Sequence, residues 1–205
     1  MTDNRVKDRR IVRTRSMITD ALLALLQKRA YAEISIIDIT EQANINRSTF
    51  YAHYIDKDDL LNKMIDEKLD RLIALGRFHQ ASPASTSAFN EPDPYYVALF
   101  EHLGEHDIFY RVMLDRPAAG DFNAKMQDII KSSFFSRISN MGLDQKLQVP
   151  LDILLDYIGC STQGVIATWL FNNRMYSPHY MALQLTRLSS LGIYSAMGIE
   201  GASTR

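Results

Sequence analysis

The sequence has little of what several protein classes require. Its single cysteine, Cys160, excludes an internal disulfide and fits a reducing compartment. The longest aliphatic run, Ala21 to Leu26, is far shorter than the roughly 18 residues that cross a bilayer, and the polar start lacks the apolar stretch of a secretory signal. The 46% of hydrophobic residues still suffice for a globular core. We therefore expect a cytoplasmic protein without a membrane segment.

The chain as a whole also lacks an excess of positive or negative charge, since the formal net charge of the 205 residues is −1. It is unevenly distributed, because residues 1–57 carry 10 Lys and Arg against 7 Asp and Glu, and the remainder carries 13 against 17. The first fifteen residues include Arg5, Lys7, Arg9, Arg10, Arg13 and Arg15. A basic N-terminal region favours contact with phosphates, and a solvated arm is the alternative.

No convincing alternation of apolar and polar residues predicts a strand, whereas helical periodicity recurs along the chain. The predicted fold class is therefore all-α. Capping chemistry supports three helix starts, at Ser35 with Asp38, at Asn46 and at Asp56. The expected helices cover about 12–28, 36–43, 47–53, 57–76, 95–106, 108–114, 121–141, 150–173 and 178–192.

Two short predicted helices around a turn of about three residues form the most informative segment. Residues 35–46 followed by 47–53 have the spacing of a helix-turn-helix. Ile45 and Phe50 provide an apolar underside for the second helix. Its remaining positions supply hydrogen-bond donors, namely Arg47, Ser48, Thr49, Tyr51 and His53. An ordinary helical hairpin is the alternative, but this density of donors favours recognition of base edges.

The stretch from Ser35 to Tyr54, continued by Lys57 and Leu60, resembles the signature of the TetR-family transcriptional regulators. The resemblance covers about residues 10–75. It implies a homodimer in which a three-helix N-terminal domain binds DNA and a larger helical domain binds an effector and dimerises. The family usually has glycine where this chain has Asn44, and asparagine accepts the same turn.

Composition and resemblance together define the expected domains. Residues 1–56 form a helix-turn-helix DNA-binding domain with a basic arm, and residues 57–78 form a connecting helix. Residues 79–94 are rich in Ala, Ser, Thr and Pro and predict a flexible linker. Residues 95–205 form the helical ligand-binding and dimerisation domain. That half loosely resembles the subgroup of dihydroxyacetone kinase activators.

Roles for single residues combine side-chain chemistry with the family resemblance. Arg47 suits a bidentate contact with guanine, with a phosphate contact as the alternative, and Ser48 and Ala52 are further base-reading candidates. The resemblance assigns Thr49, Tyr51, His53 and Lys57 to the DNA backbone. Ser35 is added to that set because a backbone N–H at a helix start can bind phosphate.

A two-fold dimer would read a pseudo-palindromic operator, and the last two helices are the expected interface. The interface candidates are Ile158, Val165, Trp169, Leu185 and Leu188. Aromatic and methionine residues suggest an effector pocket formed by Tyr96, Phe100, Tyr110, Met113, Met126, Phe134 and Trp169. They serve equally well as core residues, and a protein partner is the alternative to a small-molecule effector. We expect a repressor that uses no cofactor.

An enzyme is the remote alternative. His102, Glu105 and His106 match the H-x-x-E-H pattern of some zinc peptidases, with two imidazoles one helical turn apart. Those enzymes take a third ligand from a downstream acidic residue, and the only later glutamate here is Glu200. We therefore expect neither catalysis nor a resident metal.

Overall fold

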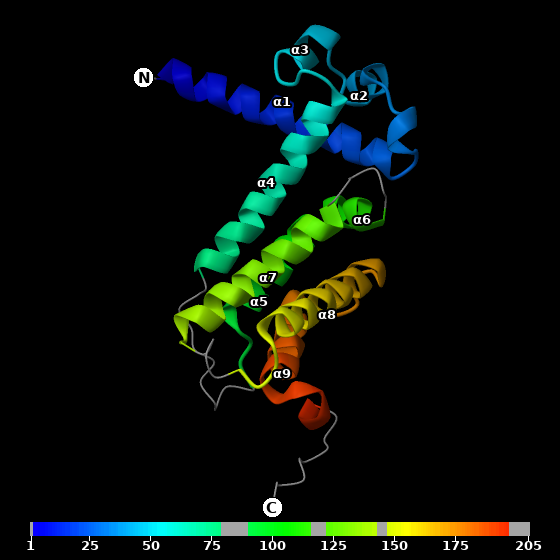
Figure 1. The fold of residues 1–205 in the computed structure, drawn as a ribbon. Coiled ribbons are helices and arrows are strands. Elements are labelled where there is room, and N and C mark those ends of the chain that lie inside the picture. The colour runs from blue at the N-terminus through cyan, green and yellow to red at the C-terminus, as the bar shows by residue number, and fades with distance from the viewer. Residues whose placement is uncertain (1, 79–89, 116–121, 143–146, 197–205) are drawn as a thin grey trace, which may run out of the picture. The chain divides into compact units, whose positions relative to one another are not determined.

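A computed structural model describes residues 2–78, 90–115, 122–142 and 147–196. Within these ranges the chain forms helices and no strand, which confirms the predicted all-α class. Figure 1 labels the elements, which in chain order are α1 (Thr2–Leu26), the 3₁₀ turn η1 (Tyr31–Glu33), α2 (Ile36–Gln42), α3 (Arg47–Tyr51), α4 (Lys57–Phe78), α5 (Pro94–Glu105), α6 (Asp107–Asp115), α7 (Phe122–Asn140), α8 (Leu151–Phe171) and α9 (Pro178–Ala196).

Most helix boundaries agree with the predicted ones to within two residues, and α1 is the main exception. This helix begins at Thr2, whereas periodicity predicts a start near Val12. Residues 2–11 lack an apolar stripe but contain neither glycine nor proline and are rich in Arg and Lys, which are good helix formers. Most of the predicted linker over 79–94 lies outside the described residues.

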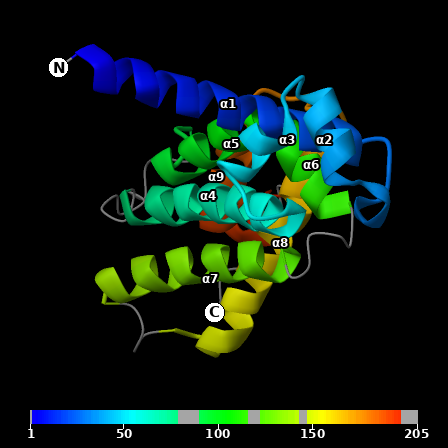
Figure 2. The same cartoon turned by 90° about the horizontal axis from the view of Figure 1, so that it is seen from above.

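The chain divides into two compact units. Unit 1 comprises residues 1–68 and 112–122, and unit 2 comprises residues 69–111 and 123–205. In unit 1, α1 packs on α2 and α2 on α3, and both views show the N-terminal end of α1 projecting beyond them (Figures 1 and 2). The core of unit 1 is apolar and includes Ile18, Leu22, Leu26, Ile39, Phe50 and Leu60, each 1% exposed or less.

In unit 2, α5 packs along α9, and the two helices lie side by side in Figure 2. Asp93 caps α5 by accepting a hydrogen bond from the Tyr95 N–H at 2.9 Å. The same carboxylate forms an ion pair with Arg137 of α7, and both side chains are largely buried, with exposed fractions of 12% and 9%. The Asp93 N–H donates to the Thr186 hydroxyl of α9 at 2.8 Å. One aspartate thereby ties three helices of unit 2 together.

The turn between α8 and α9 contains two consecutive residues in the left-handed region, Asn173 at φ 53° and Arg174 at φ 52°. The Arg174 guanidinium donates to the Gly104 carbonyl at 2.7 Å and lies 3.4 Å from the Asp107 carboxylate. The turn is therefore fastened to the junction of α5 and α6. Among the described residues, none of the helices is both long enough and apolar enough to cross a membrane.

Candidate nucleic-acid interface

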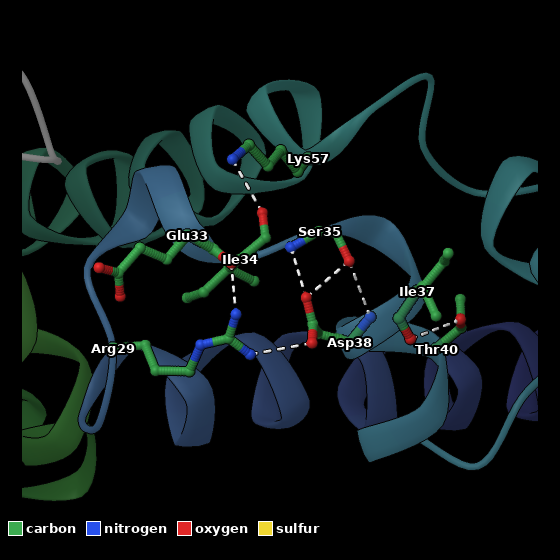
Figure 3. A network of polar contacts seen from close by, with 8 residues as sticks. All are labelled: Arg29, Glu33, Ile34, Ser35, Ile37, Asp38, Thr40 and Lys57. Carbon is green, nitrogen blue, oxygen red and sulfur yellow. Dashed lines mark hydrogen bonds and ion pairs between the residues drawn. The ribbon is translucent and has the colours of Figure 1, made fainter.

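The start of α2 is fixed by a reciprocal pair of hydrogen bonds, shown in Figure 3. The Asp38 N–H donates to the Ser35 hydroxyl oxygen at 3.2 Å, and the Ser35 N–H donates to the Asp38 carboxylate at 2.7 Å. These contacts form the predicted capping box and occupy two backbone donors that would otherwise lack a helical partner.

Arg29, which lies between α1 and η1, extends this network. Its guanidinium donates to the Asp38 carboxylate at 2.9 Å and to the Glu33 carbonyl (Figure 3). Hydrogen bonds from Ser35 and then from Arg29 hold the pKa of Asp38 well below its usual value, because they favour the charged form. Sequence reasoning predicts the cap but misses Arg29, since a contact nine residues away follows no helical spacing.

The turn after α2 has the hydrogen bonds of a Schellman motif. The Asn44 N–H donates to the Glu41 carbonyl at 3.1 Å, and the Ile45 N–H donates to the Thr40 carbonyl at 3.0 Å. Asn44 has a φ of 52°, in the left-handed region that asparagine tolerates better than most side chains. The geometry of this turn therefore accepts Asn44 at the position where the family usually has glycine, as expected from the sequence.

Asn46 then caps α3. Its side-chain oxygen accepts hydrogen bonds from the Thr49 N–H, the Thr49 hydroxyl and the Ser48 hydroxyl, each at 2.7 Å. Phe50 is fully buried and its ring lies 5.8 Å from that of Tyr54, so this side of α3 packs on the core. The cap and the aromatic contact together fix which side of α3 faces outward.

The outward side of α3 carries most of the predicted base-reading and backbone-binding residues. Arg47, Ser48, Tyr51 and Ala52 are exposed, and Thr49 and His53 are half-buried. The exposed and half-buried members lie within one short helix and its first following turn. The structure therefore brings together the side chains that the sequence singles out for DNA.

Ser35 and Lys57 differ from the other predicted backbone contacts because they have partners within unit 1. The Ser35 N–H donates to Asp38, so the donor predicted for a phosphate is already engaged. The Lys57 ammonium donates to the carbonyls of Tyr31 at 3.0 Å and Ile34 at 2.9 Å, and it lies 4.4 Å from the centre of the Tyr31 ring. Figure 3 shows the Lys57 contact with Ile34, which joins the start of α4 to the strand-like segment before α2.

The predicted basic arm forms the first turns of α1. The side chains of Arg9, Arg10, Arg13 and Arg15 are exposed along this helix. The side chains of Arg5 and Lys7 lie outside those that the structure describes. A row of exposed guanidinium groups suits attraction to a polyanion.

The residues predicted for an effector pocket form part of the aromatic core. Six of the seven are buried and Phe134 is half-buried. The rings of Phe100 and Trp169 meet edge to face at 5.1 Å, and those of Tyr96 and Phe134 lie 6.0 Å apart. Met113 belongs to unit 1, whereas the other six residues belong to unit 2. Burial raises the pKa of Tyr96 to about 12, so its hydroxyl stays protonated at neutral pH.

The residues predicted for a dimer interface differ in exposure. Leu188 is exposed, Ile158 and Val165 are half-buried, and Trp169 and Leu185 are buried within unit 2. A groove of about 650 Å³ lies beside them on α8 and α9, and sequence reasoning did not anticipate it. Its lining shares only Trp169 with the predicted pocket and includes Gly164, Val165, Tyr176, Tyr180 and Met181. The rings of Tyr176 and Tyr180 stack 4.8 Å apart. Tyr176 lies in the α8–α9 turn and Tyr180 in α9, so no helical periodicity in the sequence linked them to the residues of α8.

His102, Glu105 and His106 also come together, at the junction of α5 and α6. One potential ligand atom from each side chain lies within 4.8 Å of the others. His102 is buried, and Glu105 is exposed.

Comparison with known proteins identifies the family. The family model described as "Bacterial regulatory proteins, tetR family" matches residues 18–64, and the TetR model described as "Transcriptional regulator C-terminal region" matches residues 90–191. The chain belongs to the TetR family. The N-terminal model of this TetR-family chain covers the helix-turn-helix described above. Relatives and fold neighbours of this TetR-family chain are likewise transcription regulators rather than enzymes.

Two curated relatives match parts of this TetR-family chain. An uncharacterised HTH-type transcriptional regulator of Bacillus subtilis, YxbF, is 48% identical over 67 residues, which are 32% of this chain and 18% of YxbF. The transcriptional activator of the dhaKLM operon from Lactococcus lactis, DhaS, is 29% identical over 104 residues, which are 48% of this chain and 47% of DhaS. The chain thus spans less than half the length of these relatives.

A solved structure of a transcriptional regulator shows the same fold as this TetR-family chain. FadR from Bacillus subtilis, solved in complex with stearoyl-CoA, aligns with a TM-score of 0.62 over 87% of this chain and 98% of FadR. The sequence identity is 17%, so the likeness concerns the fold.

Proposed function

We propose that two copies of this chain bind a pseudo-palindromic operator as a repressor and that a small-molecule effector modulates the binding. Each copy places α3 in the major groove, with Arg47, Ser48 and Ala52 toward base edges. Thr49, Tyr51 and His53 contact the sugar-phosphate backbone. The exposed arginines of α1 contribute attraction to the phosphates.

The arrangement around α3 carries this proposal. A Schellman motif fixes the backbone of the turn before α3, and Asn46 caps the first turn of the helix. The buried Phe50 side chain packs the opposite side of α3 on the core. Its outward side carries Arg47, whose planar guanidinium can donate two hydrogen bonds to guanine. Such a fixed helix suits direct readout, because its backbone needs no further ordering when the protein binds DNA.

Exposed apolar side chains on α8 and α9 support the proposed homodimer. Ile153 and Tyr157 of α8 are 56% and 53% exposed, and Leu188 of α9 is 43% exposed. On the same face of α8, Gly164 has open space around the position of a side chain. Apolar residues gathered with a small residue on one face favour close packing of another helix.

The small-molecule effector is supported by the fold and by the aromatic interior. FadR shares this fold and was solved with stearoyl-CoA. In this chain Trp169, one of the proposed pocket residues, meets the Phe100 ring edge to face and lines the α8–α9 groove. An effector would act by binding one arrangement of the two DNA-binding domains more tightly than another.

The second candidate function is activation through a protein partner. It is favoured by the match to DhaS, which is named as an activator of the dhaKLM operon. Footprinting on genomic DNA followed by transcription from the bound promoter separates the two signs of regulation.

The DNA-binding proposal predicts a specific effect of Arg47→Ala. Footprinting first provides an operator, and binding is then measured by fluorescence anisotropy on that operator and on single-base variants. We expect Arg47→Ala to lose about 1–3 kcal/mol of discrimination at one base pair of each half-site. Arg71→Ala, which removes an exposed arginine of unit 2, is the matched control and should leave discrimination unchanged. An equal loss on operator and random DNA would assign Arg47 to a phosphate instead.

The dimer proposal predicts that Gly164→Leu disrupts self-association. A Cβ atom at position 164 would meet no atom outside the local helix backbone within 4 Å, so we expect the fold to tolerate a leucine there while its added bulk blocks an approaching helix. Sedimentation equilibrium should show at least a tenfold weaker dimer, with an unchanged circular dichroism spectrum. Ala124→Leu adds similar bulk at an exposed position on α7 and should leave the dimer intact. A Gly164→Leu protein that dimerises like the original chain would place the interface elsewhere.

A further inference from the structure

We propose that His102, Glu105 and His106 form a binding site for one zinc ion at the junction of α5 and α6. The inference concerns binding of the metal, which is independent of the proposed repressor function. It makes no claim of hydrolysis, and it departs from the expectation drawn from the sequence that these residues hold no metal, because the three ligand atoms lie within 4.8 Å of one another. The site uses the two imidazole rings and the carboxylate as ligands.

Helix geometry brings the two imidazoles together. His102 and His106 are four residues apart, so their side chains leave α5 on the same side. The His106 N–H donates to the His102 carbonyl at 3.2 Å, and the His106 carbonyl accepts from the Tyr110 N–H at 3.2 Å. His106 therefore belongs to the backbone hydrogen bonds of both helices. The two rings lie 4.8 Å apart at an angle of 77°.

Glu105 completes a set of three ligands with little rearrangement. The three potential ligand atoms lie within 4.8 Å of one another. Around a tetrahedral zinc with bonds of about 2.0–2.1 Å, neighbouring ligand atoms lie about 3.3 Å apart. Each ligand atom therefore needs to move by roughly 1 Å. The Glu105 side chain is exposed, so rotation of its torsions supplies most of this movement.

The surroundings of His102 resemble the outer shell that orients a metal ligand. His102 is 7% exposed, and its Nε2 atom lies 2.9 Å from the Tyr110 hydroxyl. The Tyr110 ring is fully buried and packs edge to face on Phe109 at 5.2 Å, which fixes the position of that hydroxyl. A ligating histidine usually makes such a hydrogen bond with its second ring nitrogen. We therefore assign metal coordination to Nδ1 of His102, with Tyr110 as the positioning residue.

The ligand types determine the metal class. Two imidazoles and one carboxylate suit zinc and its neighbours cobalt and nickel, whereas calcium and magnesium prefer oxygen ligands alone. Three protein ligands leave the fourth tetrahedral position for water or a small anion. The ion would join the last turn of α5 to its C-cap residue His106, next to Gly104, whose carbonyl accepts a hydrogen bond from Arg174 of the α8–α9 turn.

The test measures metal binding by protein that carries no affinity tag. After chelation and dialysis, the chain is titrated with zinc chloride in a calorimeter and with cobalt chloride in a spectrophotometer. We expect one ion per chain and visible absorption typical of tetrahedral cobalt. Glu105→Gln and His106→Ala should each weaken binding at least tenfold. Glu101→Gln changes an exposed glutamate one turn earlier on α5 and should have no effect.

Two further variants guard against misinterpretation. Tyr110→Phe leaves all three ligands in place and should weaken binding about tenfold, as expected for an outer-shell partner. Cys160→Ser removes an exposed thiol that can bind zinc by itself and should leave binding unchanged. Absence of saturable binding at one ion per chain would overturn the proposal. Full binding by His106→Ala, or loss of binding in Cys160→Ser, would also overturn it.

Discussion

Each of the two units has its own internal polar contacts, and the capping contacts of unit 1 and the Asp93 contacts of unit 2 span different distances along the chain. Around the helix-turn-helix, the capping bonds of Ser35 with Asp38 and of Asn46 with Thr49 join residues three positions apart. In unit 2, the Asp93 amide reaches Thr186 over 93 positions, and the Asp93 carboxylate reaches Arg137 over 44. The helix-turn-helix is thus capped by local contacts, and unit 2 depends on contacts between distant segments.

This difference has an energetic consequence. An exposed cap contributes about 1 kcal/mol, and its loss is partly compensated by water. A buried ion pair between distant helices behaves differently, because removing one partner leaves a charge without compensation in the interior. We expect substitutions of comparable size to cost more in unit 2 than in unit 1.

The largest effect is expected for Asp93→Asn. The amide keeps an oxygen to cap α5 but leaves the buried Arg137 without a counter-charge, and we expect a loss of about 3–5 kcal/mol in the free energy of unfolding of unit 2. Urea unfolding followed by peptide-level hydrogen exchange measures this loss. Asp152→Asn, at an exposed position in the first turn of α8, is the control and should cost less than about 1 kcal/mol. Restoration of stability by Arg137→Met in the Asp93→Asn background would confirm the cause, and a loss below that of the control would contradict it.

Lys57→Met is expected to have an intermediate effect. It keeps the apolar stem but removes two hydrogen bonds to the Tyr31 and Ile34 carbonyls, so unit 1 should lose about 1–2 kcal/mol of stability. The salt dependence of operator binding should change little, because the ammonium is engaged within the domain. Lys63→Met removes an exposed pair with Asp59 and serves as the control. Unchanged stability with a salt slope lower by about one unit would instead assign Lys57 to a phosphate.

The smallest effect is expected for the caps. Asn46→Ala removes the oxygen that accepts three hydrogen bonds at the start of α3, and we expect a loss of about 1 kcal/mol in unit 1. Ser177→Ala removes the exposed cap of α9 in unit 2, where the Tyr180 N–H donates to its hydroxyl at 3.2 Å. Similar losses in thermal unfolding would show that local chemistry is alike in both units. A much larger loss of stability for Ser177→Ala than for Asn46→Ala would show that caps contribute differently in the two units and would contradict this expectation.

Much of the fold follows from the sequence because its signals are short-ranged. The capping box of Ser35 and Asp38, the cap at Asn46 and the left-handed turn at Asn44 each depend on residues within one helical turn, and the structure confirms all three. The extension of α1 to Thr2 was missed because the apolar stripe is absent there, although nothing in that segment opposes a helix.

Contacts of long range were not predictable in the same way. Nothing in the order of residues indicates that Arg137 pairs with Asp93 or that Lys57 turns back to η1. The assignment of Lys57 to the DNA backbone came from the family resemblance. A resemblance matches sequence positions and carries no information on the Tyr31 and Ile34 carbonyls that accept hydrogen bonds from Lys57 in this chain. The α8–α9 groove was missed for a related reason, since it depends on how two helices and their turn pack.

The turn at Asn173 and Arg174 keeps two consecutive residues in the left-handed region, which is unfavourable for residues with a side chain. Each residue with a side chain in the left-handed region costs roughly 1–2 kcal/mol, which glycine would avoid. Glycine at position 174 would also remove the guanidinium that donates to the Gly104 carbonyl and forms an ion pair with Asp107. Natural variation at this corner should therefore be asymmetric, with glycine acceptable at 173 and resisted at 174.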